Sequence, residues 1–207
     1  MVITILCGQR PKLLRRTLFS LFKQMPQLKN EKIIVLINGK DDESLSLIKR
    51  YGIKKYLTTE SIQPIGVNLS ILAELAYETK ERLWFHLEDD WQALNSDIDR
   101  AVDILDKHEE ISQVRMRLDK EPVLNYHMIT GEPIIWQYKN GYKVAKAHYT
   151  MNPSLIRTTD IHKAYPCTGE RDAQKNWLDN QYVAQLVPGI FKHIGVKSLR
   201  KITKCEP

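Results

Sequence analysis

Three consecutive carboxylates are the residues of this sequence whose types and spacing point most clearly to a chemical function. Glu88, Asp89 and Asp90 follow the apolar stretch 82–87 and precede Trp91. Adjacent carboxylates repel one another, so a folded chain needs cations or hydrogen-bond donors to offset that cost. A hard divalent cation does so with oxygen ligands and leaves positions open for phosphate oxygens. The triplet therefore predicts a metal-assisted site, and a solvated acidic turn is the simpler alternative.

The segments that must position these acids alternate between short apolar stretches and amphipathic ones. The apolar stretches predict buried strands at 2–6, 32–37, 55–57 and 82–87. Apolar residues at helical spacing predict helices at 12–24, 43–51, 68–80 and 97–108. This alternation is typical of an α/β fold with a mostly parallel central sheet flanked by helices.

Chemically useful residues follow three of these predicted strands. Cys7 and Gly8 come after the first strand, Asn38 and Gly39 after the second, and the acidic triplet after 82–87. Ligands of parallel sheets bind at the carboxyl ends of the strands. The sequence therefore predicts that these residues converge on one ligand site.

The pattern after residue 110 is less regular. The elements predicted there are a strand at 114–118, a hairpin or loops over 119–147, a strand at 154–157, a helix at 171–186 and a strand at 189–195.

Composition limits the class of protein. A chain of 207 residues with 43% hydrophobic residues is large enough for one domain with a proper core. Its net charge of +6 suits an anionic partner such as a nucleotide, a nucleic acid or an acidic glycan. Cys7, Cys167 and Cys205 have no paired spacing, which favours a reducing compartment, and we expect a cytoplasmic protein. No apolar run approaches the roughly 20 residues of a membrane span.

Three motifs, in this order and spacing, resemble those of the family 2 glycosyltransferases and their GT-A-fold relatives. They are the loop and Leu-rich helix at 7–18, the Asn-Gly turn at 37–42, and the acids at 88–90 in place of the family's Asp-X-Asp. The resemblance implies a single Rossmann-like GT-A domain with a nucleotide-sugar-binding half at 1–95. The acceptor-binding and catalytic half is then 96–207.

The resemblance also implies roles for single residues in binding the donor, expected to be a UDP-sugar. Asp90 takes the place of the metal ligand, and Glu88 that of the acid that approaches the ribose or the metal's water shell. Asn38 stands where the family has an Asp that contacts the nucleotide base, and Glu88 replaces the first Asp of the motif. Because of these two departures, the resemblance does not fix which nucleotide the donor carries. The implied donor-binding set is Cys7, Gly8, Arg10, Asn38, Gly66, Glu88 and Asp89.

The second half of the chain supplies candidates for a further metal ligand and for the base. His193 and Gly195 match a late His-x-Gly of GT-A enzymes whose imidazole completes the metal shell, and imidazole suits Mn²⁺ better than Mg²⁺. The family's catalytic base, needed for transfer with inversion, corresponds first to Glu170 and second to Asp172. Acids at this place also stabilise a helix N-terminus, which is the alternative interpretation.

The acceptor stays open between duplex DNA with hydroxymethylated bases, as in phage DNA-modifying enzymes, and a glycan. Two basic surfaces favour an anionic acceptor. They are a predicted helix face (Lys12, Arg15, Arg16, Lys23) and the basic tail (Lys192, Lys197, Arg200, Lys201, Lys204). Two other classes remain as alternatives: a sugar nucleotidyltransferase, and a non-catalytic nucleic-acid-binding module.

Overall fold

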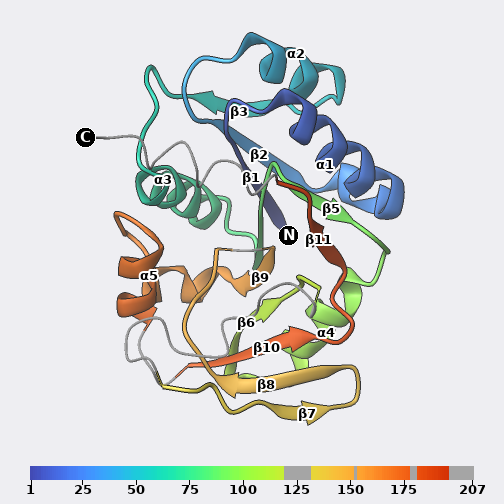
Figure 1. The fold of residues 1–207 in the computed structure, drawn as a ribbon, viewed down its shortest axis with the longest axis vertical. Helices are drawn as coiled ribbons and strands as arrows, with labels where there is room; N and C mark the ends of the chain where they lie inside the picture. The colour runs from blue at the N-terminus through green and yellow to red at the C-terminus, as the bar shows by residue number, and fades with distance from the viewer. Residues whose placement is uncertain (119–131, 152, 178–180, 196–207) are drawn as a thin grey trace, which may run out of the picture.

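The computed structural model describes residues 1–118, 132–151, 153–177 and 181–195. Within these residues, a nine-stranded sheet runs through the middle of the molecule in the order β3-β2-β1-β4-β9-β6-β10-β8-β7, with helices on both faces (Figure 1). A mixed α/β fold with a large, mostly parallel central sheet is therefore confirmed.

The first four strands form a wholly parallel block at one side of the sheet. They are β1 (Val2–Cys7), β2 (Lys32–Ile37), β3 (Lys55–Thr58) and β4 (Leu83–Glu88). Every residue of β1 is buried, as expected for an apolar strand covered by helices on both faces. Because Cys7 pairs with Ile37 and Leu6 with Glu88, the carboxyl ends of these strands lie side by side.

Antiparallel pairing enters the sheet with β9 (Ser154–Arg157), which lies between β4 and β6 (Ile111–Arg115). The remaining strands are β10 (Tyr182–Leu186), β8 (Tyr142–Lys146) and β7 (Gln137–Lys139). A separate two-stranded sheet joins β5 (Trp91–Ala93) to β11 (Phe191–His193). The predicted division of function near residue 95 stays a prediction.

Helices bury one hydrophobic cluster on each face of the sheet. The first face is covered by α1 (Pro11–Gln24), the short 3-10 helix η1 (Pro26–Asn30), α2 (Asp42–Arg50) and α4 (Ile98–Lys107). The second face is covered by α3 (Ile65–Glu78), the 3-10 helix η2 (Thr158–Lys163) and α5 (Glu170–Trp177). None of the helices in the described residues is long and apolar enough to cross a membrane.

Predicted and observed elements agree closely in the first half and diverge in the second. The predicted helix at 171–186 is wrong beyond residue 177, because 182–186 forms β10 between β6 and β8. Pairing with two neighbouring strands outweighs the local helical pattern there. The strand predicted at 114–118 begins earlier, at Ile111. Of the predicted hairpin region, 137–146 forms β7 and β8, whereas 119–131 lies outside the described residues.

Candidate functional site

Asp89 fastens the loop after β1 to the turn after β4. Its side chain is fully buried, its Oδ2 accepts a hydrogen bond of 2.9 Å from the Gly8 amide, and its Oδ1 pairs with the Arg10 guanidinium. The backbone is held as well, since the Asp89 amide donates to the Leu6 carbonyl and Thr17 Oγ1 donates to the Asp89 carbonyl. Both carboxylate oxygens of Asp89 are therefore engaged by protein donors.

Asp90 is the second partner of the same arginine. Arg10 Nη1 donates to Asp90 Oδ2 at 2.8 Å, so one guanidinium bridges two adjacent carboxylates. Burial raises the pKa of Asp89 despite the opposing effect of Arg10. For Asp90, burial acts in the same direction, but His193 and Arg10 together outweigh it and lower the pKa. Asp90 is therefore the more firmly ionised of the two acids.

His193 meets Asp90 although 103 positions separate them in the sequence. Antiparallel pairing of β11 with β5 places His193 opposite Trp91, and the Ile194 amide donates to the Asp90 carbonyl at 2.8 Å. His193 Nε2 then lies 3.2 Å from Asp90 Oδ2. Gly195 packs against both, because a Cβ there would come within 2.5 Å of Asp90 Oδ2. The structure thus brings together the two residues expected to hold a metal.

These two side chains fit a divalent cation. Two ligands at right angles around an ion with bonds of about 2.1 Å lie roughly 3 Å apart, close to the 3.2 Å between Asp90 Oδ2 and His193 Nε2. Asp90 Oδ1 is buried and accepts no hydrogen bond from the described residues, and a buried oxygen of this kind is one that a bound ion or water would satisfy. Within those residues no group of three or more His, Cys, Asp or Glu could hold an ion. The protein offers few ligands, and water or a substrate phosphate must provide the rest.

Asn38 organises the neighbouring edge of this site from the end of β2. Its Oδ1 accepts from the Gln63 amide at 2.7 Å and its Nδ2 donates to the Gln63 carbonyl at 2.9 Å. The next residue, Gly39, has a φ of +90° that favours glycine, and its amide donates to Thr59 Oγ1. The Asn38 side chain therefore holds the loop that leads into α3.

Cys7 occupies the predicted edge with its backbone, whereas its side chain belongs to the core. The thiol is fully buried in the cluster beneath α1 and α2, and burial raises its pKa far above the usual range. Its carbonyl accepts a hydrogen bond of 2.8 Å from the Asn38 amide. This environment favours the neutral thiol, so Cys7 contributes its backbone to the predicted edge and its side chain to the core.

Gly66 and Ser70 join the start of α3 to the loop before α5. A Cβ on Gly66 would lie 2.0 Å from the Thr168 carbonyl carbon, so only glycine permits this approach. Ser70 Oγ accepts from the Cys167 amide at 2.9 Å and donates to the Cys167 carbonyl. Gly66 therefore has a packing role that links the edge organised by Asn38 to the region of the expected base.

The two candidate bases lie in the first turn of α5. Glu170 is the first residue of the helix, and its side chain lies outside the part that the structure describes. Asp172 accepts a hydrogen bond from Thr168 Oγ1, which lowers the pKa of Asp172. That bond stabilises the helix terminus, and it makes Asp172 a weaker base than a free carboxylate.

Glu88 and His86 point to the same face of β4, since side chains two positions apart in a strand share a face. Burial raises the pKa of Glu88 to about 7 and lowers that of His86 to about 3. His86 is fully buried, and its Nδ1 lies 2.8 Å from Thr4 Oγ1. His86, Thr17 and Gln63 were not identified from the sequence, and only His86, a polar residue inside an apolar strand, gave a visible signal.

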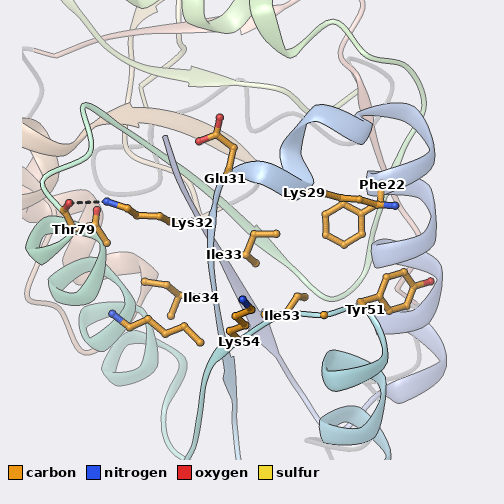
Figure 2. A pocket seen from close by; sticks show the side chains of 12 residues that line it. Phe22, Lys29, Glu31, Lys32, Ile33, Ile34, Tyr51, Ile53, Lys54 and Thr79 are labelled. Carbon is orange, nitrogen blue, oxygen red and sulfur yellow. Dashed lines mark hydrogen bonds between the residues drawn. The ribbon is translucent and has the colours of Figure 1, made fainter.

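A large cavity lies at the opposite end of the sheet from these acids. Figure 2 shows its lining around the first residues of β2 and the segment before β3, including Phe22, Lys32, Tyr51 and Ile53. Its volume is about 420 Å³. It contains none of the residues expected to bind the donor.

Solved structures of other proteins share the fold of this chain. No protein-family model matches the sequence, and no curated protein matches it significantly. The fold is similar to that of S. aureus TarS 1–349 in complex with UDP-GlcNAc, with a TM-score of 0.65 and 16% identity over 95% of this chain and 59% of that one. It is also similar to GalNAc-T7 with UDP, GalNAc and Mn²⁺, with a TM-score of 0.64 and 11% identity over 94% of this chain and 44% of that one. This chain therefore spans about three fifths of the TarS fragment, and it has the GT-A fold of these two glycosyltransferases.

Proposed function

We propose that this protein is a glycosyltransferase that moves a sugar from a UDP-sugar to an acceptor hydroxyl. The observation that carries the proposal is the convergence of Gly8, Arg10, Asn38, Asp90 and His193 at the carboxyl ends of the parallel strands. Ligands of open α/β sheets bind at that edge. Complexes of similarly folded proteins with UDP or UDP-GlcNAc support the donor class.

Asp90 and His193 would hold Mn²⁺, or Mg²⁺ in its place, in this proposal. When bound, the cation stabilises the negative charge of the diphosphate that departs from the sugar. The loop containing Gly8 and Arg10 would face the nucleotide from β1, and Asn38 would shape the base pocket by holding Gln63. Glu88, partly buried beside them, would lie next to the ribose.

Transfer of the sugar needs a base that takes the proton of the attacking hydroxyl, and we place this base in the second half of the chain. The acceptor oxygen forms a bond to the anomeric carbon, the bond from that carbon to the diphosphate breaks, and the hydroxyl proton passes to a carboxylate. Glu170 is the proposed base on the family resemblance, and Asp172, which accepts a hydrogen bond from Thr168, is the alternative. Attack from the side opposite the diphosphate gives inversion.

The exposed face of α1 favours an anionic acceptor. Lys12, Arg15, Arg16 and Lys23 are exposed along this helix. Duplex DNA with hydroxymethylated bases and an acidic glycan share that chemistry, and a steep loss of DNA binding with added salt would select DNA. The basic tail lies outside the described residues, except for the exposed Lys192 of β11. The cytoplasmic location stays a prediction.

The proposal is tested by measuring the nucleotide released from UDP-, GDP- and CMP-sugars with Mn²⁺, with and without hydroxymethylated DNA or glycan acceptors. We expect acceptor-stimulated release of UDP. Asp90→Asn should lower its rate by about 100-fold or more, and Asp103→Asn, on the exposed side of α4, should leave it unchanged. Release of pyrophosphate from a nucleoside triphosphate and a sugar phosphate would instead identify a nucleotidyltransferase. DNA binding without turnover of any donor would identify a non-catalytic module.

A further inference from the structure

Arg10 is placed differently with respect to its two carboxylate partners. Asp89 is fully buried and saturated, with Oδ1 on Arg10 and Oδ2 on the Gly8 amide. Asp90 uses only Oδ2, which Arg10 Nη1 and His193 Nε2 share at 2.8 and 3.2 Å, while its Oδ1 has no partner among the described residues. Asp89 is thus a fixed partner of Arg10, and Asp90 is an exchangeable one.

The oxygen that Arg10 contacts is the same one that faces His193. A divalent cation held by Asp90 Oδ2 and His193 Nε2 would stand against the positive charge of the guanidinium, and the two cations repel each other at such short range. The Arg10 side chain is 28% exposed, so it has room to move toward solvent, whereas Asp89 is 0% exposed and remains in place.

We propose that Arg10 is a resident cation that neutralises Asp90 in the free protein and turns from Asp90 to the donor's diphosphate when the nucleotide and a divalent cation bind. The inference rests on the proposed function and adds to it a coupling between the metal and the donor. The Nη2 contact with Asp89 acts as the pivot, and the freed Nη1 donors match phosphate oxygens in the fork geometry of arginine.

The consequence is that metal and nucleotide bind cooperatively. Without the nucleotide, a cation must displace Arg10 from Asp90, and the Nη1 donors of Arg10 then have only water as an acceptor. With the nucleotide, the diphosphate accepts those N–H groups and also supplies the ligands that the described residues lack. Each ligand then raises the affinity for the other by the same factor.

The test measures Mn²⁺ binding from the electron paramagnetic resonance signal of free Mn²⁺, with and without UDP. For the wild type we expect at least about tenfold tighter Mn²⁺ binding when UDP is present, which lies within the usual range of coupling between sites. Arg10→Gln should bind Mn²⁺ more tightly than the wild type in the absence of UDP. UDP should then raise the Mn²⁺ affinity of this variant by a smaller factor than that of the wild type, because only the direct phosphate ligands remain to couple the two. Arg50→Gln, an exposed arginine at the end of α2, is the matched control and should behave as the wild type.

A second readout guards against an unstable variant. Arg10→Gln should melt at a lower temperature than the wild type in EDTA, and Mn²⁺ alone should raise its melting temperature more than it raises that of the wild type. Arg10→Lys keeps the charge but cannot bridge both acids, so its Mn²⁺ affinity should fall between the two.

The failures of the two proposals can be told apart. Wild-type protein that binds neither UDP nor Mn²⁺ overturns the proposed function together with this inference. Wild-type protein that binds both, while folded Arg10→Gln binds Mn²⁺ no more tightly than the wild type without UDP, overturns the role of Arg10 alone.

Discussion

The two ends of the central sheet differ in volume and in chemistry. At the amino ends of β2 and β3 lies a cavity of about 420 Å³, lined by apolar and aromatic side chains, exposed lysines, Glu31 and Thr79. At the carboxyl ends of β1, β2 and β4, an arginine, two acids and a histidine from distant parts of the chain contact one another. Cavity size alone would identify the amino ends as the ligand site, whereas convergent polar groups with perturbed pKa values identify the carboxyl ends.

Removing the charge of Asp90 tests whether the carboxyl ends of the strands form the donor site, and it has the largest expected effect. Asp90→Asn should lower the rate of UDP-sugar turnover by about 100-fold or more, because a lost metal contact costs several kcal/mol of transition-state stabilisation. The rate of UDP release at saturating donor measures this. A variant that folds normally and keeps full activity would remove the carboxyl end from consideration.

Gly66→Ala tests whether the carboxyl end depends on the close packing of α3 against the loop before α5. The added methyl group would overlap the backbone at Thr168 and Gly169, and we expect the free energy of unfolding to fall by about 1–3 kcal/mol. Urea denaturation measures it. Gly169→Ala, where a Cβ meets nothing within 4 Å, is the control and should change stability much less.

The pKa of Glu88 predicts a pH dependence of stability at this end. Its pKa is about 7 in the folded protein and 4.5 ordinarily, so the folded state binds the extra proton between these values. The contribution of Glu88 is therefore full below pH 4.5 and is lost as the pH rises through 7, by about 1–3 kcal/mol. Denaturation in EDTA from pH 4.5 to 8 should show a steeper decline for the wild type than for Glu88→Gln. Parallel curves for the two proteins would refute the assignment, and Glu60→Gln serves as the exposed control.

A charge reversal at the cavity should have the smallest effect, and it tests whether the cavity takes part in UDP binding. Lys54→Glu changes an exposed residue of the cavity lining, far along the strands from Asp90. The Kd for UDP in 0.15 M salt should change less than about twofold, because exposed charges beyond a Debye length are screened. A loss of UDP affinity larger than that of Asp90→Asn would place the nucleotide at the cavity.

The first half of the fold and the site's acids were predictable because their signals are local. The apolar strands, the helical spacing of 12–24 and the three acids after 82–87 each stand in one short window of sequence. β10 was mistaken for helix, since its conformation depends on β6 and β8. The packing role of Gly66 depends on Thr168, a hundred residues away, and nothing near Gly66 in the sequence indicates it. His193 was placed by family resemblance, whereas the β5–β11 pairing that carries it to Asp90 has no local signature.

The most direct test of where the donor binds is a titration of ¹⁵N-labelled protein with UDP and Mg²⁺, followed by backbone amide chemical shifts. The carboxyl-end site predicts the largest shift changes at Gly8, Asn38 and Gly195, with Gly52 at the cavity unchanged. The reverse pattern, with changes at Gly52 and Ile53 and none at Gly8 or Gly195, would contradict it.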